Sequence, residues 1–86
     1  MANYKVFIST SAEKALSALP QRDIVRIISL IRSLGVNPRP QGCRKLSGRD
    51  DTYRVRLGVY RIIYDIHDDE LTVLVLKVGH RKDVYR

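Results

Sequence analysis

A short β-hairpin is predicted by YRVRLGVYR, residues 53–61 of the 86-residue chain. Polar and apolar residues alternate on both sides of its centre. A two-residue repeat of this kind is typical of a half-buried strand. Gly58 suits the positive-φ position of a tight two-residue turn, so Leu57 is expected to lie opposite Tyr60. The hairpin therefore has one apolar face, which can be buried, and one basic face.

Three arginines share that basic face. The expected register places Arg56 directly opposite Arg61, with Arg54 two residues along the same strand. Like charges that face each other across a strand pair destabilise it. An anion would neutralise them, and phosphate matches the planar guanidinium fork. The hairpin thus indicates a phosphate-binding surface.

Length and composition predict one small domain, residues 1–86. The chain has no Trp and one Phe, so its core must be mostly aliphatic. No apolar run is long enough to span a bilayer, and the N-terminus lacks the pattern of a secretory signal. Cys43 is the single cysteine, which fits a reducing cytoplasm.

The formal net charge is +7, with an isoelectric point near 10. Such an excess indicates a polyanionic partner, which could be a nucleic acid, an anionic membrane surface or an acidic protein. A membrane role is disfavoured because the expected helices lack bulky apolar anchors.

The rest of the chain predicts an α+β fold with the order β-α-α-β-β-β. Two N-terminal helices are expected to pack on one face of a mostly antiparallel four-stranded sheet. Thr10 and Glu13 are expected to form a capping box at the first helix, and Pro20 to open the second. The expected elements are a strand Tyr4–Ile8, helices Ser11–Ala18 and Pro20–Leu34, a loop Val36–Asp51, and strands Tyr53–Leu57, Tyr60–Ile66 and Leu71–Val78.

No cofactor or metal site is expected. His67 and His80 have no cysteine near them, and the chain contains no HExxH motif and no phosphate loop of the Walker kind. What remains is a basic and aromatic set, to which VGHRKDVYR, residues 78–86, adds Arg81, Lys82 and Tyr85. Cleavage of RNA by its own 2′-hydroxyl requires cations around the scissile phosphate and groups that move two protons.

Four short motifs, in this order and spacing, resemble the RelE family of toxin–antitoxin toxins. They are Lys45-Leu46-x-Gly48, Tyr53–Leu57, Tyr60–Tyr64 and Val78–Tyr85. The resemblance implies a ribosome-dependent mRNA endonuclease that cuts the codon in the ribosomal A site. It also implies a RelB-like antitoxin that blocks the toxin, and binding to operator DNA only through the toxin–antitoxin complex.

The resemblance also implies roles for individual residues. Arg54 and Arg56 match the two basic strand positions of the family, and Arg61 matches its phosphate clamp. Arg81 matches the arginine that stabilises charge or the leaving group. Tyr85 matches the tyrosine that stacks on a base or orients the nucleophile.

A second set is expected to contribute RNA contacts rather than catalysis. Lys45 is an expected contact to ribosomal RNA, and Arg44 and Lys82 are expected to join it in binding RNA.

Alternatives stay open at this point. A ParE-like toxin would share the fold but inhibit DNA gyrase, and a non-catalytic module would bind nucleic acid without cutting it. One of the hairpin arginines could instead pair with Asp50, Asp51 or Asp65.

Overall fold

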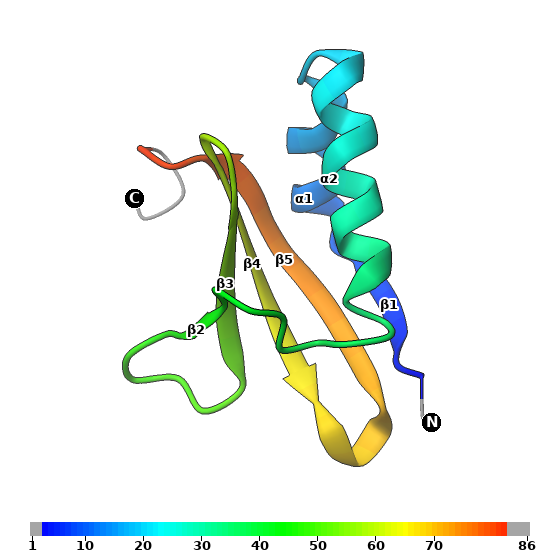
Figure 1. The fold of residues 1–86 in the computed structure, drawn as a ribbon, viewed down its shortest axis with the longest axis vertical. Coiled ribbons are helices and arrows are strands. Elements are labelled where there is room, and N and C mark those ends of the chain that lie inside the picture. Colours follow the sequence, from blue (N-terminus) through cyan, green and yellow to red (C-terminus); the bar gives the residue numbers. More distant parts are fainter. Residues whose placement is uncertain (1–2, 83–86) are drawn as a thin grey trace.

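A five-stranded mixed sheet forms the centre of the computed structural model, which describes residues 3–82 (Figure 1). The strand order is β1-β5-β4-β3-β2; β1 runs parallel to β5 and the other pairs are antiparallel. The elements are β1 (Lys5–Ile8), α1 (Thr10–Ser17), α2 (Gln21–Ser33), β2 (Arg44–Lys45), β3 (Thr52–Leu57), β4 (Tyr60–His67), the 3₁₀ turn η1 (Asp68–Glu70) and β5 (Thr72–His80).

The hairpin register is confirmed. Leu57 lies opposite Tyr60, and Arg56 lies opposite Arg61. The φ angle of Gly58 is +60°, whereas that of Val59 is not positive. A positive φ at only the first turn position is the type II′ pattern, in which glycine is favoured.

The prediction of four strands was wrong. The expected loop contains β2, whose two residues pair with β3. A two-residue strand made only of cations carries no alternating pattern, so nothing in the sequence distinguishes it from a loop. The direction of β1 was also not predicted, since hydrophobicity does not report whether a strand runs parallel to its neighbour.

The cap of α1 differs from the prediction by one residue. Ser9, rather than Thr10, is the N-cap, and its Oγ accepts a hydrogen bond from the backbone N–H of Ala12 at 3.1 Å. The Ser9 hydroxyl also donates to the carbonyl oxygen of Leu76 in β5 at 2.9 Å. This tertiary contact explains the shift, because it ties the Ser9 hydroxyl to the sheet as well as to the helix.

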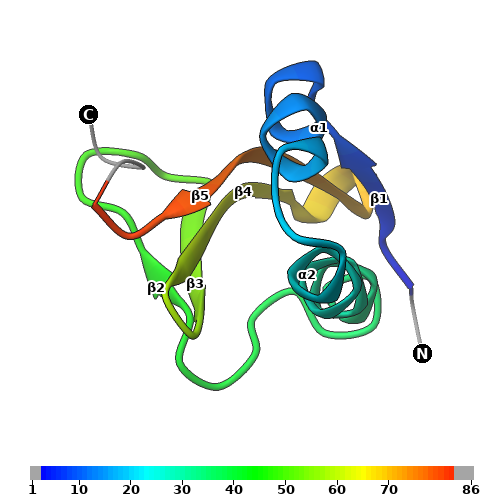
Figure 2. The same ribbon diagram turned by 90° about the horizontal axis from the view of Figure 1, so that it is seen from above.

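Both helices contribute to one hydrophobic core on one face of the sheet. Figure 2 shows α1 and α2 near the β1–β5 side, with β2 and β3 projecting away from them. On α2, Ile27 and Ile31 are four residues apart and both are buried, so this side of the helix faces the core. The buried members are Ala12, Leu16, Ile27, Ile31, Leu34, Val55, Ile62, Tyr64, Ile66, Val73, Val75 and Val78. Neither helix within residues 3–82 has the length and apolarity needed to cross a membrane.

Candidate nucleic-acid interface

The sheet face opposite the core carries cations from four strands. Strand alternation turns Arg54 and Arg56 away from the core, since Val55 between them is buried. The same rule applies to Arg61, which precedes the buried Ile62. We call this surface the basic face, and its cations are Arg44, Arg54, Arg56, Arg61 and Lys77.

Strand register arranges the basic face in two rows that cross the sheet. One row runs through Arg44, Arg54, Ile63 and Lys77, which are successive partners from β2 to β5. Because neighbouring strands lie about 4.8 Å apart, this row spans roughly 14 Å of backbone. Cations at its two ends are therefore spaced to contact an extended polyanion at more than one phosphate.

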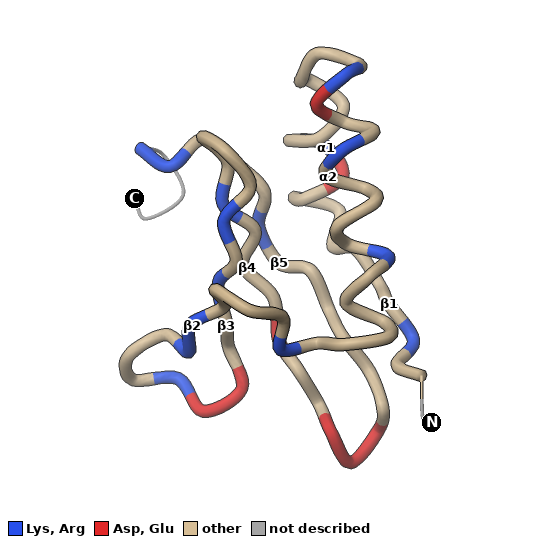
Figure 3. The backbone as a smooth tube through the Cα atoms, viewed as in Figure 1, with Lys and Arg blue, Asp and Glu red and all other residues tan. Residues whose placement is uncertain are grey.

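The second row is shorter and contains the like-charged pair. Arg56 lies opposite Arg61, and Arg61 lies opposite Gly79 of β5. Gly79 carries no side chain, so nothing from β5 crowds the Arg61 guanidinium at that position of the row. Figure 3 shows the blue cationic positions gathered on the upper parts of these strands, with red acidic positions at the opposite ends.

The basic-face arginines differ in exposure. Arg56 is exposed, whereas Arg54 and Arg61 are half-buried and their Nε atoms are shielded from solvent. Partial burial lowers the local dielectric and strengthens the attraction of a cation for an anion. Arg54 and Arg61 are thus better placed than a fully solvated arginine to hold a phosphate.

Lys77 also lies on the basic face, although the sequence analysis did not predict a role for it. Val73 and Val75 are buried, so simple alternation would turn Lys77 into the core as well. A register irregularity between Ile63 and Tyr64 changes this, because Tyr64 pairs with Val75 whereas Ile63 pairs with Lys77. The β-bulge moves Lys77 to the basic face, where it is exposed.

The two β2 residues that were expected to bind RNA separate onto opposite faces. Arg44 pairs with Arg54 and joins the basic face, whereas Lys45 pairs with Tyr53. Tyr53 packs against the core side of the sheet. Both cations are exposed, but the structure brings only Arg44 into the row with the hairpin arginines.

Arg81, the first residue after β5, lies against the hairpin turn. The backbone N–H of Arg81 donates to the carbonyl oxygen of Val59 at 2.8 Å, which holds Arg81 beside the end of β3 and β4. Arg81 and Lys82 are both exposed, and the backbone N–H of Lys82 donates to Nδ1 of His80 at 3.3 Å. Tyr85, the remaining expected catalytic residue, lies outside the described residues.

Aspartates considered as competitors for the arginines make contacts near the start of β3. Asp65 accepts a hydrogen bond from Oγ1 of Thr52 at 2.6 Å and lies 3.9 Å from Nε2 of His67. Asp51 lies 3.9 Å from Nδ1 of the same histidine. These contacts are at the end of the hairpin that is opposite to its turn.

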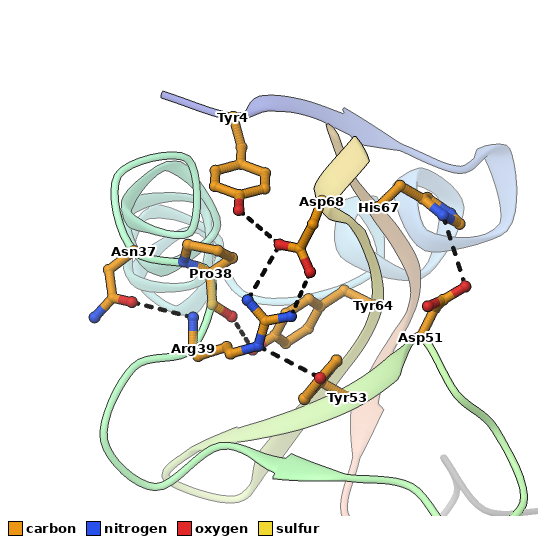
Figure 4. A network of polar contacts seen from close by, with 9 residues as sticks. All are labelled: Tyr4, Asn37, Pro38, Arg39, Asp51, Tyr53, Tyr64, His67 and Asp68. Atoms are coloured by element: carbon orange, nitrogen blue, oxygen red, sulfur yellow. Dashed lines mark hydrogen bonds and ion pairs between the residues drawn. The ribbon is translucent and has the colours of Figure 1, made fainter. Parts of the chain in front are cut away.

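An ion pair anchors the loop that leads into β2 (Figure 4). Nη2 of Arg39 lies 2.8 Å from Oδ2 of Asp68, while Tyr4 donates its hydroxyl hydrogen to the same carboxylate at 2.6 Å. The hydrogen bonds from Arg39 and then Tyr4 lower the pKa of Asp68 to about 2. The carboxylate correspondingly raises the pKa of the Tyr4 hydroxyl.

Two tyrosines support the same loop from the sheet. The buried Tyr64 donates a hydrogen bond to the carbonyl oxygen of Pro38 at 2.8 Å, and burial raises the pKa of its hydroxyl. Tyr53 stacks on Tyr64 with ring centroids 6.2 Å apart, and the Arg39 guanidinium lies 5.2 Å from the Tyr53 ring centre. These aromatic residues are structural, and they hold the loop in one position.

The described residues contain no metal-type cluster. Within residues 3–82, no group of three or more His, Cys, Asp or Glu is placed to hold a metal ion.

Comparison with known proteins places the chain among toxins over nearly its whole length. Residues 6–85 match the family described as the ParE toxin of the type II toxin–antitoxin system parDE. The toxin RelG of Mycobacterium tuberculosis is 36% identical, covering 96% of this chain and 97% of that toxin.

Solved structures agree with this similarity. The toxin–antitoxin complex RelBE2 from Mycobacterium tuberculosis contains a chain with 32% identity and a TM-score of 0.83, covering 96% of this chain and 97% of that one. The archaeal RelE–RelB complex from Pyrococcus horikoshii gives 32% identity and a TM-score of 0.83, covering 95% and 99%. The chain therefore belongs to the RelE/ParE family of toxins from type II toxin–antitoxin systems.

Proposed function

We propose that this toxin is a ribosome-dependent mRNA endoribonuclease that cuts the codon in the A site and so inhibits translation. The observation that carries the proposal is the basic face, where Arg56 and Arg61 share one cross-strand pair beside Arg54. A cluster of fixed cations is what a phosphodiester requires as negative charge builds up on it in the transition state.

The proposed reaction uses the substrate's own ribose. The 2′-hydroxyl loses its proton, its oxygen bonds to the adjacent phosphorus, and the bond from phosphorus to the 5′ oxygen of the next nucleotide breaks. That leaving oxygen then gains a proton, and a 2′,3′-cyclic phosphate remains. A guanidinium stays protonated at neutral pH, so Arg54, Arg56 and Arg61 act as electrostatic stabilisers. The ribosome supplies substrate positioning.

Cleavage on programmed ribosomes tests this proposal. Arg61→Ala and Arg81→Ala are each expected to lower the single-turnover rate by at least 10²-fold, which is the loss seen for one preorganised charge donor elsewhere. Arg22→Ala, which removes an exposed cation from α2, should cut at the wild-type rate. Unimpaired cutting by both site variants would refute the assigned site, and binding of RNA without any cutting would favour a non-catalytic module.

A second candidate function follows from the family model itself. The matching family is described as a ParE toxin, and a ParE-like activity would be inhibition of DNA gyrase. A supercoiling assay with purified gyrase separates the two. Inhibition at stoichiometric toxin, with mRNA on ribosomes left intact, would replace the nuclease proposal.

We also propose a RelB-like antitoxin as the toxin's partner, with operator DNA bound only by the pair. Support comes from the similar solved chains, which are toxins in complexes with RelB, and from the net charge of +7, which suits an acidic partner. The edge strand β1 offers a place for an added strand. Co-expression of the toxin with its antitoxin should yield a soluble complex. The proposal would be contradicted if the toxin were harmless when expressed alone and no small acidic protein co-purified with it.

A further inference from the structure

A cleft of about 300 Å³ opens at the edge of β3, next to the basic face. Its lining comprises Gln41, Gly42, Arg44, Arg54, Val55 and Arg56. Within the described chain, β2 pairs with β3 only at Tyr53 and Arg54, so β2 does not extend along the rest of that edge. The cleft lies at the N-terminal end of β2, and Gln41 is the uncharged polar side chain in its wall.

A tight turn places Gln41 at this wall. The backbone N–H of Cys43 donates to the carbonyl oxygen of Pro40 at 3.1 Å, and Gly42 has φ +92°. Glycine with positive φ at the third position of a turn is the type II pattern, which puts Gln41 at the corner. An added Cβ at Gly42 would meet nothing within 4 Å, so its backbone conformation is what requires glycine here.

The turn is fixed on both sides. Before it, Arg39 is tied to Asp68, and the carbonyl oxygen of Pro38 accepts the buried Tyr64 hydroxyl (Figure 4). After it, Cys43 packs against the core and Arg44 enters the sheet. The backbone that carries Gln41 is held in place by these contacts, so this part of the chain loses little freedom when a ligand binds.

We propose that this cleft is a nucleotide subsite, in which Gln41 reads the base next to the phosphate held by Arg54 and Arg56. The inference rests on the proposed RNA-cleaving function and deepens it. The cations at three of the lining positions attract the phosphates of the RNA backbone, but they do not distinguish one base from another. A glutamine amide has both a donor and an acceptor, so it can pair with a base edge. The volume is at the lower end for small-ligand sites and suits a single nucleotide.

Binding can be tested apart from cleavage. The chain has two glutamines, Gln41 and Gln21, and Gln21 lies at the start of α2 and does not line the cleft. The probe is a set of 2′-O-methyl RNA trinucleotides, which lack the attacking hydroxyl and differ in one base. On titration, the side-chain amide NMR signal of Gln41 should move by an amount that depends on that base, while the Gln21 signal stays in place.

Two variants test specificity on programmed ribosomes. Gln41→Ala should still cut, but its preference among the four nucleotides beside the cut should fall roughly three- to tenfold, the effect of one hydrogen bond. Gln41→Glu places a carboxylate among three arginines and should lower cutting at least tenfold. Gln21→Glu makes the same change in net charge and should stay within twofold of wild type. Thermal unfolding of each variant checks that the exposed substitutions leave the fold intact.

The outcomes separate this inference from the proposed function. Base-independent or absent movement of the Gln41 signal would overturn the subsite, and so would an unchanged cleavage preference in Gln41→Ala. In both cases a defect in Arg61→Ala would leave the nuclease proposal standing. If the wild-type toxin does not cut, the nuclease proposal fails, while base-dependent movement of Gln41 would still support a nucleotide subsite.

Discussion

Arg56 lies directly opposite Arg61 in the antiparallel ladder of β3 and β4, so two full positive charges share one cross-strand pair. Such a pair weakens the hairpin that contains it. An anion bound between the two guanidinium groups would reduce their mutual repulsion. Its binding is therefore expected to raise the stability of the hairpin.

Substitution of one member of the pair should show this link. Arg56→Gln is expected to raise the free energy of unfolding by about 0.2–1 kcal/mol in dilute buffer, because it removes the cross-strand repulsion. Added polyphosphate should stabilise the wild type more than the variant, since a ligand stabilises only the state that binds it. Thermal unfolding with and without polyphosphate measures both effects. Equal stabilisation of the two proteins would mean that the anion binds elsewhere.

Lys77 should contribute to RNA affinity through charge alone. Lys77→Ala is expected to weaken binding of single-stranded RNA without regard to sequence, and to reduce the slope of log affinity against log salt by roughly 0.7. Fluorescence anisotropy at several salt concentrations gives the slope. Lys14→Ala, an exposed lysine of α1, is the matched control and should leave the slope unchanged. The same slope for Lys77→Ala and wild type would remove Lys77 from the interface.

The Arg39–Asp68 pair should make stability depend on acid. The pKa of Asp68 is lowered from 3.8 to about 2, so the folded state favours the ionised carboxylate. Its contribution is complete above about pH 4 and is lost as the pH falls toward 2. The difference in melting temperature between wild type and Asp68→Asn should therefore shrink over that interval.

Arg39→Gln removes the hydrogen bond that contributes most to lowering the pKa of Asp68, so it should abolish most of this acid dependence. Arg22→Gln makes the same change of charge on α2 and should retain it. Melting curves between pH 2 and pH 6 provide the measurement. A constant difference between wild type and Asp68→Asn over that range would contradict the assigned pairing.

The cap of α1 gives a test of the fold itself. Ser9→Ala is expected to lower the free energy of unfolding by about 1 kcal/mol, because the N–H of Ala12 loses its acceptor. Thr10→Ala should change it by less than about 0.5 kcal/mol, the usual range for a surface position. Urea unfolding distinguishes the two variants. A larger loss for Thr10→Ala would restore the capping box that the sequence suggested.

Local patterns predicted the hairpin and the helices because each depends on residues close together in sequence. The alternation around Gly58 determined which arginines share a face, and the register confirmed it. The spacing of Ile27 and Ile31 likewise puts them on one side of a helix, and both are buried. For these elements, short-range periodicity and burial favour the same arrangement.

Features that depend on distant partners were not predictable in this way. Lys77 reaches the basic face only because of a bulge against β4, and nothing within β5 signals that bulge. β2 exists because Arg44 and Lys45 meet an edge of β3, although their own sequence has no strand pattern. The cleft beside Gln41 depends on an anchor between Arg39 and Asp68, which are 29 residues apart. The proposed roles of Arg54, Arg56, Arg61 and Arg81 remain predictions.

Acidic and basic residues occupy opposite ends of the central strands (Figure 3). Arg56 and Arg61 flank the hairpin turn, whereas Asp68, Asp69 and Glu70 form the turn at the far end of β4. This separation of charge contributes an electric dipole along the central strands. A large polyanion would exert a torque on that dipole and rotate the molecule, cationic end first, before the surfaces touch. Correct orientation would then be selected during approach, which raises the fraction of encounters that lead to binding.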